Sequence, residues 1–521
     1  MTWIHPISAT VEASADVLGG KGHGLVMLRR LGLPGPPGFV IGTGACRAFR
    51  RDGRFPDGLA GELAAAVRDL EAATGRRLGT GDRPLAVAVR SGGSVSMPGM
   101  MNTILNLGLT TEATAALVVE TGDRRFALDS RLRFLSSFAA AVHGLAPENL
   151  AAEQREPKAE EREADTEEDR LAAAIRDVEE FLRNRGGDLP DDATRQLELA
   201  VGAVFASWDT PRAKTYRAVH DIPDDLGTAV TVQAMVFGNR DEHSGTGVAF
   251  SRNPNTGARE PFGDVVFGGQ GEDVVSGRSA TRPLPELAGR EPAVWAGLRA
   301  ALERIEQHYR DACYVEFTFE AGELFLLQVR SGGLVGRAAI RVAVELADEG
   351  VIGRREAVRR ISPGQLGSAR TPRMETTGAT DILTRGLGAG PGVAAGRVAT
   401  STEQAVRMAA GGPVILVRPY TSPLDMRGLA AAAGVVTARG GPASHAAVVA
   451  RAMGKPAVVG AADLTVDVDA GCVRAGDRTI GEGTLITIDG SSGEVAVGSP
   501  RTVTAAADPH LERLLDWAKE K

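Results

Sequence analysis

The sequence predicts a multidomain protein that combines α/β and α+β folds, and three observations lead to this prediction. A chain of 521 residues is too long for one ordinary hydrophobic core, and it suggests two to four domains. In the first two thirds, stretches in which apolar and polar residues alternate predict strands that end in glycine-rich turns, at 85–108, 231–254 and 315–330. In the last third, short apolar strands alternate with helices, as at 434–460, which is typical of a compact α/β domain.

Composition narrows the class of function. The formal net charge of −7 argues against nucleic acid as the main partner. The three cysteines, Cys46, Cys313 and Cys472, are far apart and lack metal-ligand spacing, so we expect a reducing compartment and no disulfide framework. The sequence shows neither a run of about 18 apolar residues nor a basic stretch followed by an apolar one. We therefore expect a cytoplasmic protein with no membrane partner.

The first chemically informative stretch is Leu18–Leu25, in which Lys21 stands among four glycines. We expect a glycine-rich turn here, followed by a helix over Leu25–Leu31 and a strand that starts near Gly38. A lysine in such a turn can reach a phosphate, because the backbone allows close approach. The pattern is not a Walker A loop. On this motif alone a solvated lysine is the more frequent situation, by about three to one.

The second stretch begins as the strand Leu85–Val89 and continues into a glycine-rich loop that ends at Gly108. Arg90 lies at the end of the strand, where a guanidinium group can grip phosphate oxygens. Without further context, pairing of Arg90 with a nearby carboxylate is an equally frequent arrangement.

The third stretch, Val315–Arg330, predicts a β-hairpin, because two alternating strands are joined by a short turn at 320–322. Glu316 and Gln328 would then face the same pocket from paired strands. A carboxylate and an amide oxygen suit a Mg²⁺ ion that bridges ATP phosphates, and Arg330 can clamp phosphate oxygens in the same cleft. The alternative is a surface hairpin with ordinary polar residues.

The stretch with the most specific chemistry is 440–451. It follows the short apolar strand 434–438, and we expect Ser444 to cap a helix that runs to Met453 and ends at Gly454. His445 then sits at the start of a helix, where free N–H groups favour a phosphate and a neutral imidazole can attack phosphorus. Taken alone, a histidine in this position only packs or caps in about four cases out of five.

Resemblance to a known family favours a catalytic role for His445 over a packing or capping role. The segment 440–451 resembles the phosphohistidine motif of the pyruvate, phosphate dikinase and phosphoenolpyruvate synthase family, and His445 falls on the phosphorylated histidine. The stretches 18–25, 85–108, 231–254 and 314–330 resemble motifs of that family's ATP-grasp domain. The resemblance extends over about 18–498, which is nearly the whole chain.

The resemblance implies a role for each candidate residue. Lys21, Arg90 and Arg330 would contact the ATP phosphates, Glu316 and Gln328 would bind Mg²⁺, and Gln233 would lie at the adenine pocket. His445 would accept a phosphoryl group from ATP. It also implies four regions: an ATP-grasp domain at 1–335 with a helical subdomain at about 110–200, a helical linker or hinge at 336–380, a swivelling phosphohistidine carrier domain at 381–500, and a C-terminal tail at 501–521.

Four positions depart from the family pattern. Ala443 replaces a threonine, Ser94 replaces an arginine, and Asn102 replaces an aspartate. Tyr314 replaces another aspartate, and a phenol is a poorer ligand for a hard cation than a carboxylate. Asp311 lies three residues earlier, and the sequence leaves open whether it compensates.

The acceptor of the phosphoryl group is the remaining question. Full-length members of the family carry a pyruvate-binding (β/α)₈ barrel, which needs about 250 residues, whereas 23 residues follow Gly498. We therefore expect a separate chain, a barrel that binds pyruvate or phosphoenolpyruvate, to supply the acceptor site. The motifs resemble the branch that uses phosphate rather than water. Two rival hypotheses are a dikinase that acts on another small molecule or protein, and a non-catalytic regulator that binds ATP.

Overall fold

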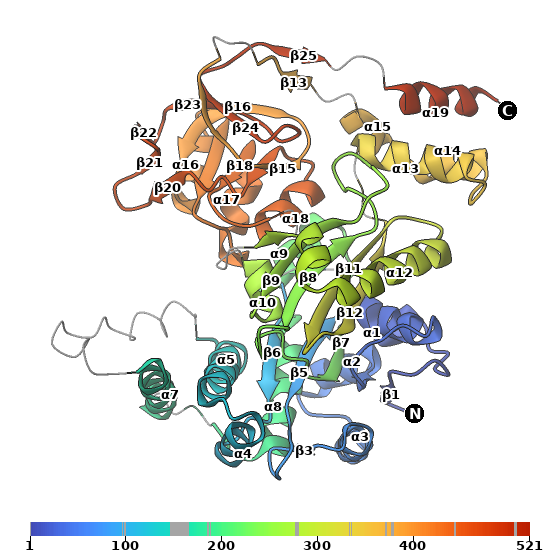
Figure 1. The fold of residues 1–521 in the computed structure, drawn as a ribbon, viewed down its shortest axis with the longest axis vertical. Helices are drawn as coiled ribbons and strands as arrows, with labels where there is room; N and C mark the ends of the chain where they lie inside the picture. The colour runs from blue at the N-terminus through green and yellow to red at the C-terminus, as the bar shows by residue number, and fades with distance from the viewer. Residues whose placement is uncertain are drawn as a thin grey trace. The chain divides into compact units, whose positions relative to one another are not determined.

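The computed structural model describes residues 2–95, 97, 100–145, 166–184, 187, 189–276, 281–332, 334, 336–369, 372–376, 380–441, 444–504 and 508–520. Contacts divide the chain into two compact units, residues 1–236 and 237–521. Figure 1 colours the chain from its N-terminus to its C-terminus and labels most of the elements named below. No helix among the described residues is both long and apolar enough to cross a membrane.

The first unit is built on a five-stranded antiparallel sheet (Figure 1). One face of this sheet is apolar and forms the core of the unit together with the surrounding helices. In spatial order the strands are β1 (Ile4–Pro6), β2 (Gly38–Ile41), β7 (Ala229–Ala234), β5 (Val87–Gly92) and β6 (Thr103–Leu107). The strands β3 (Arg77–Leu78) and β4 (Pro84–Leu85) form a separate small parallel pair, and they lie between β2 and β5 in the sequence.

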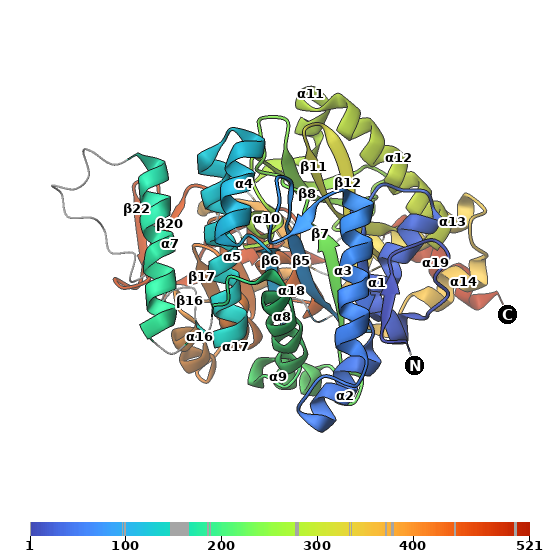
Figure 2. The ribbon, with the colours of Figure 1, turned by 90° about the horizontal axis from the view of Figure 1, so that it is seen from below.

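Eight described helices complete the first unit, and Figure 2 shows α5 and α7 side by side. The ion pair between Arg131 of α5 and Glu179 of α7, at 2.7 Å, joins these two helices. The helices are α1 (Ala15–Arg30), α2 (Thr43–Asp52), α3 (Leu59–Thr74), α4 (Thr111–Thr121), α5 (Arg124–His143), α7 (Glu167–Asn184), α8 (Ala193–Ser207) and α9 (Pro211–Val219). The region expected to be helical, about 110–200, thus holds α4, α5, α7 and most of α8.

The second unit begins with another five-stranded antiparallel sheet, which includes the predicted hairpin. Its strands are β10 (Arg282–Pro283), β9 (Phe262–Phe267), β8 (Gly245–Phe250), β11 (Cys313–Glu320) and β12 (Glu323–Ser331), in spatial order. The elements beside it are α10 (Gly271–Ser276), η1 (Leu284–Glu286), α11 (Leu287–Arg290) and α12 (Pro292–Tyr309). The predicted hairpin turn is correct, and its residues Ala321 and Gly322 have positive φ angles of 50° and 80°.

An eight-stranded mixed sheet forms the core of residues 381–500, the predicted carrier region. Its central strands β16, β17, β18 and β19 are parallel, so their carboxyl ends meet at one edge. The spatial order is β14 (Ile382–Arg385), β24 (Glu494–Val497), β23 (Leu485–Asp489), β16 (Val393–Ala399), β17 (Val414–Arg418), β18 (Gly434–Thr437), β19 (Ala457–Val459) and β15 (Leu387–Gly390). The helical elements are α16 (Thr402–Ala409), η2 (Pro423–Asp425), α17 (Met426–Ala431) and α18 (His445–Ala452); β20 (Leu464–Asp467), β21 (Cys472–Ala475) and β22 (Arg478–Gly481) form a separate small sheet.

The segments on either side of the carrier region pair with each other. Strand β13 (Pro372–Met374) runs antiparallel to β25 (Thr502–Thr504). Helix α19 (Pro509–Lys519) packs through Leu511, Leu514 and Trp517 into one apolar cluster with α13 (Gly336–Asp348), α14 (Arg354–Arg360) and α15 (Pro363–Ala369). The expected hinge at 336–380 therefore contains three helices and a strand. Part of its Pro-, Gly- and Ser-rich end lies outside the described residues.

Candidate functional site

One face of the first sheet gathers Arg90, Thr231 and Gln233. Arg90 of β5 pairs directly with Thr231 of β7, and Gln233 lies two residues further along the same strand. Directly paired residues of an antiparallel sheet, and residues two apart, point to the same side. Thr231 and Gln233 are 0% and 2% exposed, and among the described residues neither Thr231 Oγ1 nor Gln233 Nε2 has a hydrogen-bond partner. Such orphaned buried groups are costly, so this face is suited to receive a polar ligand.

Helix α1 brings Lys21 to the same face. A Cβ atom on Gly22 would lie 2.8 Å from a methyl group of Val40, which pairs with Thr231. The predicted glycine-rich turn was wrong, because the chain here is helical with a kink at Gly19, whose φ is 67°. A Cβ atom on Gly19 would lie 1.7 Å from the carbonyl oxygen of Gly92. The glycines therefore serve close packing of the helix against β5 rather than a turn.

The predicted hairpin places Glu316, Gln328 and Arg330 on one face of the second sheet. Glu316 pairs directly with Gln328, and Tyr314 pairs with Arg330, so all four side chains share that face. In the amide orientation that satisfies its neighbours, Oε1 of Gln328 accepts hydrogen bonds from Nε and Nη2 of Arg330, both at 2.6 Å. Gln328 and Arg330 therefore act as one hydrogen-bonded unit.

The structure explains one of the departures from the family pattern and bears on a second. The Nδ2 group of Asn102 donates to the carbonyl of Ala141 at 3.1 Å, and its Oδ1 accepts from Arg212 at 3.0 Å. An aspartate cannot make the first of these bonds, so an amide fits this position. Asp311 does not compensate for Tyr314: its charged neighbours are Arg360, Glu306 and Arg252, and burial raises the pKa of its carboxyl group. Ala443 lies outside the described residues.

His445 is the first residue of α18 and is 7% exposed. It follows the parallel strand β18, and Gly440, with a φ of 100°, turns the chain between them. The Nδ1 atom lies 3.1 Å from Oγ1 of Thr421. Among the described residues, the Nε2 atom of His445 has no hydrogen-bond partner. One ring nitrogen is thus held while the other is left for a ligand at a helix N-terminus.

Burial sets the charge of this histidine. It lowers the pKa of His445 to about 4 from an ordinary value of 6.5, against a smaller opposing effect of the Asp425 carboxylate. The imidazole is therefore neutral at pH 7. A neutral imidazole has the free lone pair that a nucleophile needs.

The predicted helix cap is only partly correct. Ser444 is the N-cap residue with extended φ and ψ angles, but its side chain makes no capping hydrogen bond. The Oγ atom is buried and has no partner among the described residues. Ser444 Oγ and His445 Nε2 are therefore two unsatisfied buried groups at the same helix start, as expected of an anion site.

Sequence reasoning missed the residues that hold His445. Thr421 contacts the imidazole, and Asp425 accepts hydrogen bonds from the backbone N–H of Ser422 at 2.8 Å and from Oγ1 of Thr402 at 3.0 Å. Thr421 and Asp425 follow β17, whose carboxyl end lies beside that of β18. The polar run that follows the apolar strand 414–417 was a signal that could have identified them.

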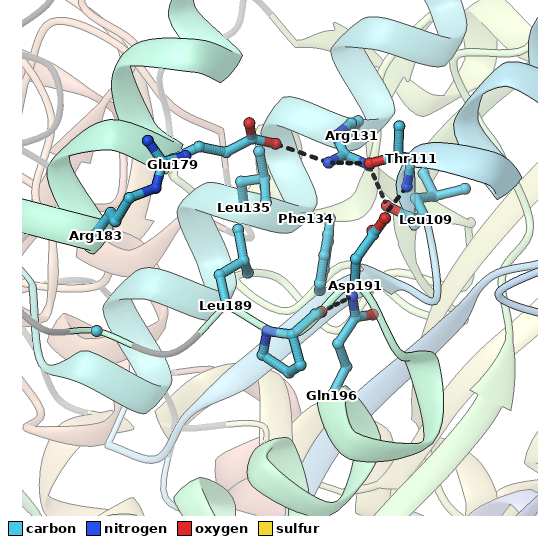
Figure 3. A pocket seen from close by; sticks show the side chains of 12 residues that line it. Leu109, Thr111, Arg131, Phe134, Leu135, Glu179, Arg183, Leu189, Asp191 and Gln196 are labelled. Atoms are coloured by element: carbon cyan, nitrogen blue, oxygen red, sulfur yellow. Dashed lines mark hydrogen bonds and ion pairs between the residues drawn. The ribbon is translucent and has the colours of Figure 1, made fainter.

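A cavity of about 350 Å³ lies elsewhere in the first unit and is shown in Figure 3. Its polar groups are occupied: Arg131 bonds to Glu179, and the backbone N–H of Thr111 donates to Asp191 at 2.9 Å. Its described lining includes none of the predicted site residues. The lining residues are Leu109, Thr111, Arg131, Phe134, Leu135, Glu179, Arg183, Gly187, Leu189, Pro190, Asp191 and Gln196.

Two family models match this chain, and each covers a different group of the predicted site residues. The model of the pyruvate phosphate dikinase AMP/ATP-binding domain matches residues 50–282, which include Arg90 and Gln233. The model of the mobile domain of PEP-utilising enzymes matches residues 411–493, which include His445. Lys21 and the hairpin residues lie outside both matched ranges. The chain therefore joins an ATP-binding domain to a PEP-utilising mobile domain, and the predicted fold class is confirmed.

Three curated relatives are similar to nearly the whole of this chain. Pyruvate, phosphate dikinase of Rhizobium meliloti is 41% identical over 541 residues, covering 99% of this chain and 60% of the relative. The chloroplastic enzyme of Flaveria pringlei is 41% identical over 97% of this chain and 54% of its own length. The chloroplastic pyruvate, phosphate dikinase 1 of Arabidopsis thaliana is 39% identical over 96% of this chain and 53% of its own length. The chain spans between 53% and 60% of the length of these relatives.

Proposed function

We propose that this chain catalyses the ATP-dependent phosphorylation of His445 in a dikinase-type phosphotransfer. The observation that carries the proposal is the neutral, buried imidazole whose Nε2 atom has no partner among the described residues and lies at a helix start. For Nε2 to attack, the ring proton must lie on Nδ1, which then donates to Oγ1 of Thr421. A neutral nucleophile held in one tautomer needs no proton removal before it attacks phosphorus.

The proposed chemistry proceeds in two displacements. A bond forms between Nε2 of His445 and the β-phosphorus of ATP, and the bond from that phosphorus to the α,β-bridging oxygen breaks, so that AMP leaves. Inorganic phosphate then attacks the terminal phosphorus, pyrophosphate leaves, and His445 keeps one phosphoryl group. Since much negative charge gathers at the phosphates, catalysis depends mainly on positioning and electrostatics.

Six of the predicted residues are proposed to bind the nucleotide and its metal. Lys21, Arg90 and Arg330 are the proposed phosphate ligands, and Gln233, with its unsatisfied buried amide nitrogen, is the proposed contact at the adenine pocket. The paired side chains of Glu316 and Gln328 are oxygen donors of the kind that Mg²⁺ prefers. Glu316 carries a charged carboxylate, which a hard cation prefers to the amide oxygen of Gln328, and Gln328 already bonds to Arg330. When bound, the metal would neutralise charge on the phosphates.

The phosphoryl acceptor is proposed to be pyruvate, and in the reverse direction phosphoenolpyruvate would be the phosphoryl donor. Support for this comes from the names of the relatives and from the match to a mobile domain of PEP-utilising enzymes. Transfer requires the carrier region to move from the nucleotide to the acceptor, with 336–380 as the proposed hinge. A cytoplasmic location is proposed together with this function.

The test uses the purified full chain with Mg²⁺ and ATP labelled at the β-phosphorus, with and without inorganic phosphate. We expect acid-labile label on the protein and release of AMP, with pyrophosphate formed only when phosphate is present. Both should be lost in His445→Ala and kept in the control His243→Ala, whose side chain is 62% exposed. Label that survives in His445→Ala would contradict the assigned nucleophile. A chain that binds ATP but forms neither label nor AMP would instead favour the non-catalytic regulator.

A further inference from the structure

Arg451 reaches from the carrier region to the strands of the neighbouring sheet within the second unit. It lies six residues after His445 in α18 and is 8% exposed. Its Nη1 group donates to the carbonyl oxygen of Ala389 at 3.0 Å, and its guanidinium carbon lies 5.8 Å from the centre of the Phe250 ring. The first contact is internal to the carrier, whereas the second joins the carrier to β8.

Phe250 belongs to a row of alternating cations and rings. Tyr314 pairs with it across β8 and β11, and the ring centres are 5.0 Å apart with planes inclined at 60°. The guanidinium carbon of Arg330 lies 5.7 Å from the centre of the Tyr314 ring. Each of the two rings therefore contacts the other ring and one guanidinium group. Such contacts are favourable and are strengthened when water is excluded.

Two further contacts join the predicted carrier region to residues in and beside the second sheet. Asn255 donates from its Nδ2 group to the carbonyl oxygen of Gly388 in β15. Gly441, in the loop before His445, leaves so little room that a Cβ atom there would lie 2.1 Å from Oδ2 of Asp264 in β9. Asp264 is 4% exposed, so it has little freedom to move away. The loop that carries His445 is therefore fitted closely against this sheet.

We propose that Phe250 and Tyr314 form a docking ledge for Arg451, and that this ledge positions the carrier region on the sheet that holds Glu316, Gln328 and Arg330. Tyr314 shares its face with these three residues, so the ledge adjoins the proposed phosphate and metal ligands. Tyr314 is thus a positioning residue that acts through Arg451. The proposal deepens the proposed function and depends on it only for the consequence on phosphorylation, because docking itself requires no chemistry.

The ledge has a consequence for the departure at position 314. An aromatic ring there packs against Phe250 and offers a face to Arg330, which a carboxylate does not. Removing the ring should lower the ratio of docked to undocked carrier by about tenfold, the effect of a well-desolvated cation–ring contact. Tyr314→Phe keeps the ring and should keep the docked state.

Docking can be measured without nucleotide by the distance between two spin labels on the full chain. Exposed positions Arg299 on α12 and Glu403 on α16 are changed to cysteine, and the half-buried Cys472 is changed to serine. Cys46 and Cys313 are buried, and burial raises the pKa of the Cys313 thiol to about 12, so they resist labelling. The variants are Tyr314→Ala, Phe250→Ala and Tyr314→Phe, with Tyr216→Ala in the first unit as the matched control.

We expect one docked distance in the parent and in Tyr314→Phe and Tyr216→Ala, and a broad distribution in Tyr314→Ala and Phe250→Ala. The circular dichroism spectra of all variants should match, because the changed side chains are partly exposed. A docked distance that persists in Tyr314→Ala and Phe250→Ala would overturn the proposal. As a second readout, labelling of His445 by ATP should slow in Tyr314→Ala with an unchanged KM for ATP. Loss of labelling in the parent, with the distances as expected, would refute the proposed function and leave the docking ledge supported.

Discussion

The buried state of His445 leads to a quantitative prediction for pH. Burial lowers the pKa of this imidazole to about 4 in the folded chain, whereas the unfolded chain binds the proton at 6.5. Between these values the unfolded state binds more protons, so stability is fully present above pH 6.5 and is lost as the pH falls. The loss amounts to about 2 kcal/mol at pH 5 and approaches about 3 kcal/mol near pH 4. His445→Gln should lack this part of the pH dependence.

Two measurements test this reasoning. In a chain with isotopically labelled histidines, the His445 resonance, assigned by its absence in His445→Gln, should stay constant from pH 8 to 5 and titrate only below. The urea midpoint of the carrier region should fall more steeply with acid in the parent than in His445→Gln, since all other titrating groups are common to both. A His445 resonance that titrates near pH 6.5, or identical pH profiles for the two proteins, would refute the neutral buried imidazole and with it the nucleophile assignment.

Three other predictions follow from contacts described by the structure. Arg252, with 0% of its side chain exposed, bonds to Glu306 and Glu345, both at 2.8 Å. Arg252→Met should therefore lower the free energy of unfolding in urea by about 3 kcal/mol. The control Arg51→Ala, on the exposed surface, should leave this free energy unchanged. Thr421→Val should slow labelling of His445 about tenfold by releasing Nδ1, while Thr421→Ser should restore it; equal rates would dismiss Thr421 as an orienting group. Lys455 donates from Nζ to the carbonyl oxygens of Leu429 and Ala432 at 2.9 and 2.6 Å, near the end of α17. Lys455→Met should therefore destabilise the carrier region by about 2 kcal/mol in the same urea titration. The control Lys519→Met, at an exposed position, should leave the stability unchanged.

The hairpin and the histidine helix could be predicted because their signals are local. Alternating polarity and a turn at 320–322 set the register that pairs Glu316 with Gln328. The apolar strand, the glycine pair and Gly454 gave the limits of α18 to within about one residue. The first glycine patch misled for a physical reason. Its glycines permit close packing of α1 against β5, and sequence alone does not distinguish this use of glycine from a turn.

The chemistry of the site could not be predicted in the same way, because it depends on groups that are distant in sequence. Thr421, which contacts His445, stands 24 positions before it. Glu316 and Gln328 come together only when β11 and β12 pair in a register that includes the bulge after Glu316. The orphaned atoms of Thr231 and Gln233 are likewise visible only when the sheet is assembled.

The departures from the family pattern show why residue type alone is a poor guide to loss of function. Asn102 removes a charge, yet its amide makes a bond to Ala141 that a carboxylate cannot make. Tyr314 removes a carboxylate, yet its ring stacks on Phe250 and lies beneath Arg330. In both cases the replacement gains a contact specific to its own chemistry. A position that had merely lost its role would be under no such constraint, so these two residues argue for a site that has been adjusted rather than abandoned.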